Sequence, residues 1–202
     1  MSIYDLKPKF QNLLRPLVIK LEQRGVTANQ VTLTACAISV ILGLILTALS
    51  GYHWLFMLIP IWLFVRMALN AIDGMLAREF NQKSRLGVYL NEITDVVSDA
   101  ALYLPFAFVH PFDALQIGLI IWLSALTEFC GVLGQVQGKT RRYDGPLGKS
   151  DRAFLFGVLG LVYVFVPTLP DFLYWLLWVV IILLIVTCVK RVKSGLVEVG
   201  NE

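Results

Sequence analysis

The chain has 202 residues, of which 57% are hydrophobic and only 15% are charged. A soluble domain normally carries about a quarter charged residues, so this composition excludes an ordinary soluble enzyme and indicates a protein of the lipid bilayer. The net charge of +3 is too small to indicate a nucleic-acid partner, and we expect none.

The first thirty residues predict an amphipathic segment rather than a membrane span. Apolar residues recur at helical spacing from Ile3 to Leu21, while Lys7, Lys9 and Lys20 occupy the other face. We expect this helix to lie on the inner leaflet with its basic residues near anionic headgroups. A solvated cytosolic helix is the alternative. Residues 1–30 form this juxtamembrane segment.

Six apolar segments that follow are predicted to be membrane-spanning helices, each of which needs about 20 mostly apolar residues. They run from Val31 to Tyr52, His53 to Ala77, Leu86 to His110, Ala114 to Gln135, Ala153 to Val166 and Phe172 to Val189. The fifth is short, so we expect it to borrow residues from its flanks or to be less tilted than the others. The prediction is an all-α integral membrane domain over residues 31–190, with a cytoplasmic tail over residues 191–202.

The basic residues predict the orientation of these spans. Of the 17 Lys and Arg residues, all but Arg66 lie before the first span, between spans two and three, between spans four and five, or after the sixth. The three opposite connections carry none. By the positive-inside rule, both termini and the even-numbered connections face the cytoplasm. We therefore expect a multi-pass protein of the cytoplasmic (inner) membrane.

Polar residues inside the spans are costly and usually functional. One face of the second span carries Arg66, Asn70, Asp73 and Ala77, and one face of the third carries Gly87, Asn91, Asp95 and Asp99. A short cytoplasmic loop joins the two spans, so we expect the two faces to meet just below the inner membrane surface. Carboxylate and amide oxygens suit Mg²⁺ or Mn²⁺ better than Zn²⁺.

Basic residues on the adjoining loops complete a pocket suited to a phosphate-bearing substrate. These residues are Arg78, Lys83, Arg85, Arg141, Arg142, Lys149 and Arg152. A metal ion neutralises the carboxylates and bridges phosphate oxygens, while Arg side chains bind the remaining oxygens. Lys149 and Arg152, three apart at a predicted helix start, are candidates to bind an anionic group.

The spacing of these residues resembles a known signature. Asp73-Gly74-x-x-Ala77-Arg78, then eight residues, Gly87, seven residues and Asp95 is similar to the pattern D-x2-D-G-x2-A-R-x8-G-x3-D-x3-D of the CDP-alcohol phosphotransferase family. The segment from Thr27 to Thr32 also resembles the family's T-P-N-x-[IVL]-T, with Ala28 in place of the proline.

The resemblance implies a membrane transferase of phospholipid biosynthesis. Family members displace CMP from a CDP-linked alcohol, usually CDP-diacylglycerol, by attack of an acceptor hydroxyl, with two divalent metals holding the pyrophosphate. Carried over, the metal positions are Asp73, Asp95, Asn70 and Asn91, and Asp95 is also the base. The nucleotide pocket would contain Gly74, Ala77, Arg78, Gly87 and Asn29, and the acceptor would meet Arg141, Lys149 and Arg152. Relatives are commonly homodimers.

The sequence departs from the family pattern at two acidic positions, Asn70 and Asn91. Amide oxygens can coordinate a hard cation but bring no charge. Glu92 and Asp99 are candidates for substitute negative charge. Arg66 either supplies positive charge where the metal site is weakened or forms a structural ion pair with Glu92, Asp99 or Glu128. The site would otherwise bind one metal tightly and recruit a second only with the pyrophosphate, or have lost its activity. The alternatives to a transferase are therefore a non-catalytic partner of a lipid enzyme and a cation- or proton-coupled transporter.

Overall fold

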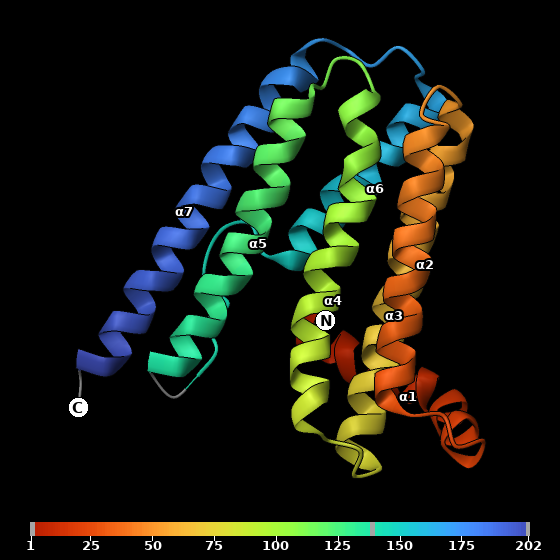
Figure 1. Ribbon diagram of the computed structural model, residues 1–202, viewed down its shortest axis with the longest axis vertical. Helices are drawn as coiled ribbons and strands as arrows, with labels where there is room; N and C mark the ends of the chain where they lie inside the picture. The colour runs from red at the N-terminus through yellow and green to blue at the C-terminus, as the bar shows by residue number, and fades with distance from the viewer. Residues whose placement is uncertain (1–2, 138–139, 201–202) are drawn as a thin grey trace.

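A computed structural model describes residues 3–137 and 140–200, which form helices joined by short connections, with no strand in this part of the chain. The elements are α1 (Ile3–Gln23), α2 (Ala28–Ala48), the 3-10 helix η1 (His53–Met57), α3 (Leu58–Glu79), α4 (Arg85–Tyr103), η2 (Leu104–Phe108), α5 (Ala114–Gln137), α6 (Lys149–Phe165) and α7 (Phe172–Gly200). Helices α2 to α7 form one bundle (Figure 1). The predicted all-α fold is confirmed.

Four stretches of the described chain are long and apolar enough to cross a membrane. They are residues 28–48, 53–79, 114–137 and 172–197. Helix α4 carries several acidic residues and α6 has only 17 residues, which explains why neither qualifies by length and composition. The protein is thus a multi-pass membrane protein, and the full set of six spans stays a prediction.

The basic segments of the chain gather at one end of the bundle. Helix α1, the α3–α4 connection, the end of α5 and the end of α7 lie there, at the bottom of Figure 1. The connections α2–α3, α4–α5 and α6–α7 lie at the opposite end. This arrangement is the one that the distribution of Lys and Arg requires.

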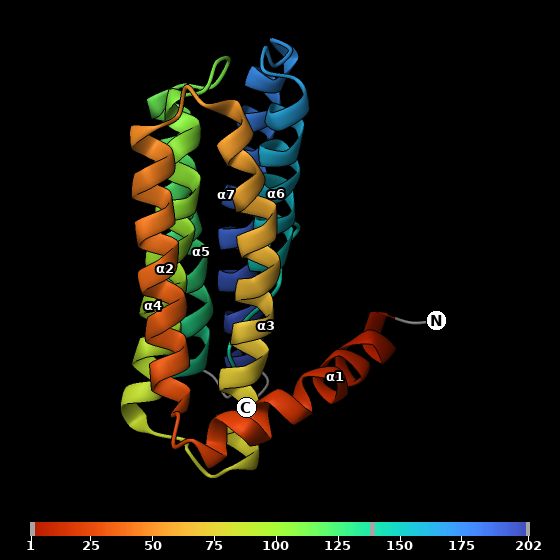
Figure 2. The same cartoon turned by 90° about the vertical axis from the view of Figure 1, so that its right-hand side faces the viewer.

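Helix α1 crosses the basic end of the bundle instead of running along it (Figure 2). Val18 is fully buried against α2 and α3, whereas Leu13 and Leu17 are 75% and 46% exposed. The apolar face is therefore divided between the bundle and the outside. The predicted helix is present, and its place on a leaflet stays a prediction.

Side-chain caps start α2 and α4 close to one another. Thr27 caps α2 through a reciprocal pair of hydrogen bonds with Gln30, of 2.9 and 3.2 Å. Ser84 Oγ accepts a hydrogen bond of 2.9 Å from the Gly87 amide and so caps α4. Asn29 Nδ2 donates to Ser84 Oγ across the two helix starts, at 3.5 Å. The caps satisfy amides at the two helix starts, which would otherwise lack partners. The contact between Asn29 and Ser84 places the two parts of the sequence signature side by side.

The connection before α6 turns back into the bundle. The Arg142 amide donates to Gly131 O of α5 at 3.1 Å, and the Leu147 amide donates to Thr187 Oγ1 of α7 at 3.2 Å. Helix α6 consequently begins about halfway up the bundle (Figure 1). Its first residue is Lys149 rather than the predicted Ala153. Helix α6 is short because it starts inside the bundle.

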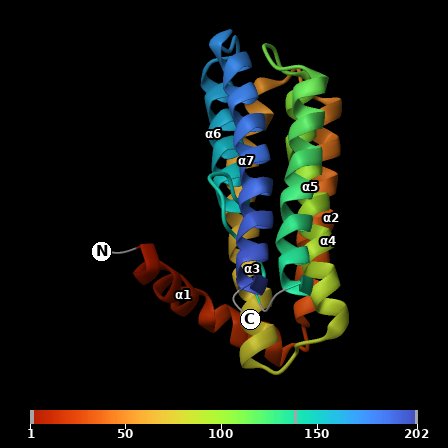
Figure 3. The same cartoon turned by 90° about the vertical axis from the view of Figure 1, so that its left-hand side faces the viewer.

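Two apolar clusters hold the bundle together. The larger one packs α5 along α7 and includes Phe56, Phe106 and Phe156, and the smaller one packs α1 against α2 and the end of α3. Figure 3 shows α7 beside α6 and α5. Helix α2 packs against both α3 and α4, which are bridged by charged side chains.

Candidate active site

A cavity of about 470 Å³ opens between the starts of α2 and α4 and the end of α3. It brings together every residue predicted for the nucleotide pocket, along with other predicted site residues. Those lining it are Asn29, Asp73, Gly74, Ala77, Arg78, Gly87, Asn91, Glu92 and Arg141. Residues far apart in the sequence therefore meet at the basic end of the bundle, as the family signature implies.

Asp73 is the buried carboxylate of this cavity, with 7% of its surface exposed. Its Oδ2 accepts a hydrogen bond of 2.7 Å from Thr32 Oγ1 of α2. No cationic side chain of the described residues forms an ion pair with it. Sequence reasoning missed Thr32, which lies in the N-terminal pattern. Its hydroxyl, one helical turn after Asn29, is the feature of the sequence that could have indicated it.

Two glycines keep the walls of this cavity thin. A Cβ on Gly74 would lie 3.0 Å from Nη2 of Arg78, and a Cβ on Gly87 would lie 2.9 Å from Oδ1 of Asn29. Both distances are too short for a side chain to be added without displacing the neighbour. The absent Cβ atoms let the side chains of Arg78 and Asn29 lie directly against the helix backbones, in the wall of the cavity.

Asp95 does not line this cavity. Its Oδ1 accepts from Arg66 Nη2 at 3.0 Å, and its Oδ2 forms an ion pair with Lys149 Nζ. Arg66 Nη2 also contacts the Asp95 carbonyl at 3.2 Å. Asp95 and Lys149 remain within electrostatic range of Asp73. The two motif carboxylates are neighbours, but only Asp95 is held by cations.

Deeper in the bundle, Arg66 and Arg152 share Asp99. Arg66 Nη1 lies 2.6 Å from Asp99 Oδ1, and Arg152 Nη2 lies 3.3 Å from Asp99 Oδ2. All three side chains are at most 5% exposed. Arg152, predicted to bind the acceptor, is instead enclosed in ion pairs. Asp99, predicted to compensate lost charge, already has two cationic partners.

The network continues through Glu128 of α5. Glu128 pairs with Arg152 at 3.0 Å, with Arg141 at 2.8 Å and with Arg191 at 3.5 Å. Arg141 also pairs with Glu92, so that residue too is neutralised by a cation. Arg191 was assigned to the tail from sequence because it follows the last apolar run, yet its side chain is 1% exposed.

Arg141 is positioned by the re-entrant connection. Its guanidinium lies 4.9 Å from the centre of the Tyr143 ring, a cation–π contact. Nearby, Arg142 Nε donates to Asp144 Oδ2 at 3.0 Å. Burial acts to raise the pKa of Asp144, but this hydrogen bond, the positive charge of Arg142 and further hydrogen bonds together outweigh burial, and the pKa lies below its usual value. The connection is thus held in place by its own charged residues.

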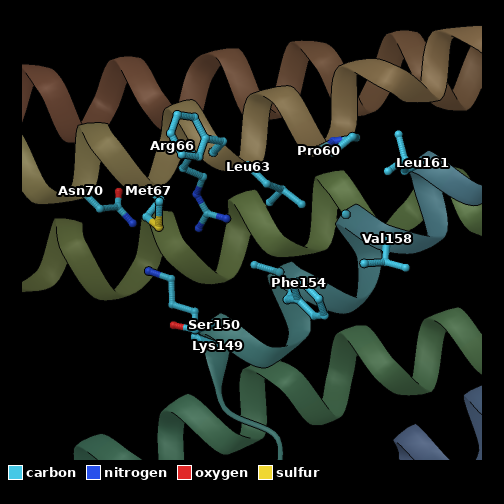
Figure 4. Close-up of a pocket in the computed structure, with 13 residues that line it drawn as sticks. Pro60, Leu63, Arg66, Met67, Asn70, Lys149, Ser150, Phe154, Val158 and Leu161 are labelled. Carbon is cyan, nitrogen blue, oxygen red and sulfur yellow. The ribbon is translucent and has the colours of Figure 1, made fainter. Parts of the chain in front are cut away.

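A second space, a groove of about 630 Å³, runs between α3 and α6. Figure 4 shows Arg66, Asn70 and Lys149 directed into one part of it, with apolar residues such as Leu63, Phe154 and Val158 along the rest. Asn70, predicted as a metal position, lines this groove and not the cavity of Asp73.

The donor set fits one hard cation better than two. Within residues 3–137 and 140–200, no three His, Cys, Asp or Glu side chains are grouped so that they could hold a metal ion. A dication about 4 Å from an ammonium is repelled by about 8 kcal/mol at an effective dielectric constant near 20. Asp95, between Arg66 and Lys149, is therefore a poor ligand. Asp73 suits an ion such as Mg²⁺, which takes most of its ligands from water and phosphate.

Comparisons with known proteins agree with the family signature gathered around the cavity of Asp73. The profile of the CDP-alcohol phosphatidyltransferase family matches residues 25–189. The inner membrane protein YnbA of Escherichia coli is 50% identical over 97% of both chains. A phosphatidylinositol phosphate synthase of Streptomyces avermitilis is 27% identical, over 92% of this chain and 78% of its own length.

Solved structures share the fold. Phosphatidylinositol phosphate synthase of Mycobacterium tuberculosis with manganese and citrate superposes with a TM-score of 0.74 at 20% identity, covering 89% of this chain and 87% of that one. The same enzyme with CDP-DAG bound gives a TM-score of 0.74 at 21% identity, covering 89% and 92%. With the matching profile and the signature gathered around one cavity, the chain belongs to the CDP-alcohol phosphatidyltransferase family of membrane transferases.

Proposed function

We propose that this chain transfers a phosphatidyl group from CDP-diacylglycerol, or a similar CDP-linked lipid, to the hydroxyl of a small alcohol and releases CMP. One observation carries the proposal: all the nucleotide-pocket residues of the signature line one cavity beside a buried carboxylate that no described cation occupies. The M. tuberculosis enzyme of the same fold binds CDP-DAG and manganese.

The cavity offers separate contacts for the parts of a cytidine diphosphate. The cavity would place the nucleotide next to Arg78, which lies over Gly74, and next to Asn29, which lies over Gly87. Arg78 and Arg141 supply guanidinium groups for phosphate oxygens. A Mg²⁺ or Mn²⁺ ion held by Asp73 with the Asn91 amide would neutralise the diphosphate. Phosphoryl transfer depends mainly on such positioning and charge neutralisation.

The groove between α3 and α6 suits an acyl chain of the donor. Apolar side chains line most of its length, while Arg66, Asn70 and Lys149 mark its polar part. A lipid whose headgroup lies near Asp95 could extend a chain along Leu63, Phe154 and Val158 toward the opposite end of the bundle. Burial of each methylene contributes about 0.8 kcal/mol.

Asp95 is the proposed base. The acceptor oxygen would form a bond to the phosphorus as the bond to CMP breaks, and Asp95 would take the hydroxyl proton. Lys149, 31% exposed, holds Oδ2 of Asp95 and also reaches the groove. An anionic group on the acceptor would attract Lys149 and Arg141, and so free that oxygen. Arg152 acts in this proposal by holding Asp99 and Glu128.

The membrane arrangement completes the proposal. The six bundle helices span the inner membrane, with the basic end and both termini in the cytoplasm, and α1 rests on the inner leaflet. Placing the cavity there gives it access to soluble acceptors. The protein works as a homodimer, as relatives commonly do.

A non-catalytic partner of a lipid enzyme is the second candidate. The observations that favour it are Asn70 and Asn91 in place of two acids and the double ion pair on Asp95. A transporter is disfavoured, because among the described residues the buried ion pairs gather around Asp99 and Glu128, and the larger apolar cluster extends toward the opposite end.

Purified protein in lipid nanodiscs, given CDP-diacylglycerol, Mg²⁺ or Mn²⁺ and a panel of alcohols with and without phosphate, tests the proposal through CMP release. We expect release with at least one acceptor and its loss in Asp95→Asn. Asp171→Asn is the matched control, because Asp171 is 90% exposed at the other end of the bundle. No release with any acceptor would favour the non-catalytic candidate.

A further inference from the structure

Both oxygens of the Asp95 carboxylate are engaged by cationic side chains, which opposes the binding of a metal ion. Arg66 of α3 donates to Oδ1 at 3.0 Å, and Lys149 of α6 occupies Oδ2. The two cations approach from different helices, so movement of one does not remove the other. Only 15% of the Asp95 side chain is exposed, which leaves little room for a third partner.

Arg66 is fixed in this position. It has a second anionic partner, Asp99, at 2.6 Å, and its side chain is 5% exposed. Asp99 in turn is held by Arg152 at 3.3 Å. Moving Arg66 out of this position would break its buried pair with Asp99, which is strongly unfavourable.

The two cations on Asp95 coincide with two missing acids. Arg66 lies one helical turn before Asn70 on the same face of α3, and Lys149 is directed toward the same space (Figure 4). With acids at positions 70 and 91, four negative charges would balance two dications. With Asn70 and Asn91, only the two negative charges of Asp73 and Asp95 remain, which is enough to balance one dication and not two.

Asp73 differs from Asp95 in its hydrogen-bond partner and in its access to a cavity. Its described partner is the neutral hydroxyl of Thr32, and it lines an open cavity together with Asn91. A hydroxyl orients a carboxylate without neutralising it. The negative charge that a divalent ion requires is therefore available at Asp73 and already compensated at Asp95.

We propose that Arg66 and Lys149 form a resident cationic pair that takes the place of a second metal ion, so that the site binds one divalent cation, at Asp73. The proposal rests on the proposed function for the role of that cation, but it concerns binding and not turnover. Asp95 is then kept as base and is not a metal ligand.

Counting bound Mn²⁺ tests this directly. The full chain in nanodiscs is equilibrated with Mn²⁺ and CDP, the bound metal is measured by equilibrium dialysis, and its environment by electron paramagnetic resonance. We expect one Mn²⁺ per chain with the spectrum of an isolated ion. Two ions per chain with a spin-coupled spectrum, or none, would overturn the proposal.

Two substitutions locate the ion. Asp73→Asn should weaken Mn²⁺ binding by about 100-fold, whereas Asp95→Asn should change the Kd by less than about threefold. Equal weakening by both would contradict the proposal. These readouts need no turnover: a chain that binds one Mn²⁺ and releases no CMP would overturn the proposed function alone.

A variant that reverses the substitution should regain the second site. Asn70→Asp, Asn91→Asp and Lys149→Met together restore two acids and remove one cation, and we expect two Mn²⁺ per chain. Asn91→Asp alone is the matched control and should tighten binding while keeping one ion. A folded triple variant that still binds one ion would refute the role of the cationic pair. If the triple variant does not fold, Lys149→Met alone is titrated with Mn²⁺. A spectrum identical to that of the unsubstituted chain would then refute the role of the pair.

Discussion

The two carboxylates of the signature are neighbours with opposite surroundings. Asp73 meets one neutral donor, Thr32, in an open cavity, whereas Asp95 lies between Arg66 and Lys149 in a network of buried ion pairs. A neutral partner leaves the negative charge of a carboxylate available to a ligand, whereas a cationic partner neutralises that charge. The same residue type in one motif is therefore available to a divalent cation in one place and is already held by two resident cations in the other.

Removing the available charge should have the largest effect. Asp73→Asn keeps the shape of the side chain but removes its charge, and we expect CMP release to fall by about 1,000-fold, equivalent to about 4 kcal/mol in the barrier. Steady-state kinetics at saturating Mn²⁺ measure it, with Asp171→Asn as control. Unchanged turnover in Asp73→Asn would show that the cavity is not the active site.

Breaking the enclosed network should act on stability instead. Arg152→Met leaves Asp99 and Glu128 with fewer cations, and we expect a loss of about 3 kcal/mol in unfolding free energy, at the lower end for a buried pair because other cations remain. Thermal unfolding in detergent measures the Tm. Arg15→Met breaks the exposed pair with Glu79 and should cost under about 1 kcal/mol. Equal effects of the two substitutions would contradict the assigned difference in burial.

Thr32→Val tests the neutral donor itself. Loss of the hydroxyl should allow Asp73 to move and lower kcat/KM by about tenfold, or about 1.4 kcal/mol. The control is Thr47→Val on the same helix, whose hydroxyl donates at 2.8 Å to the Gly43 carbonyl far from the cavity. A wild-type rate in Thr32→Val would mean that Asp73 needs no orientation from α2.

The smallest effect is expected in the groove. Val158→Trp places a larger side chain in the path proposed for an acyl chain, and we expect the KM for a CDP-linked lipid to rise about threefold, a loss of about 0.7 kcal/mol of binding. Val179→Trp, on α7 and 51% exposed outside the groove, should leave it unchanged. If both variants behave alike, the donor chain lies elsewhere.

Much of the fold followed from local patterns. Apolar runs predicted the bundle helices, and the clustering of Lys and Arg predicted that the basic connections share one end. The resemblance to the family signature predicted that Asn29, Gly74 and Gly87 share a cavity, although they come from three different helices. The helices and the basic end depend on composition and on spacing along the chain, whereas the shared cavity followed from the resemblance.

The ion-pair network could not be predicted in the same way. Whether Lys149 meets Asp95 depends on the connection before α6 turning into the bundle, a tertiary arrangement of Arg142, Gly131 and Thr187 without a period in sequence. Arg191 likewise resembled a tail residue. Long side chains reach several partners, so the position of a charge along the chain does not determine its partner.

The most direct test of the contrast between Asp73 and Asp95 is a structure of the chain with CDP and Mn²⁺, with an anomalous difference map to locate manganese. We predict one peak beside Asp73, the nucleotide against Gly74 and Arg78, and Asp95 still paired with Arg66 and Lys149. A manganese peak bound to Asp95 with Lys149 displaced, or a nucleotide outside this cavity, would contradict the account.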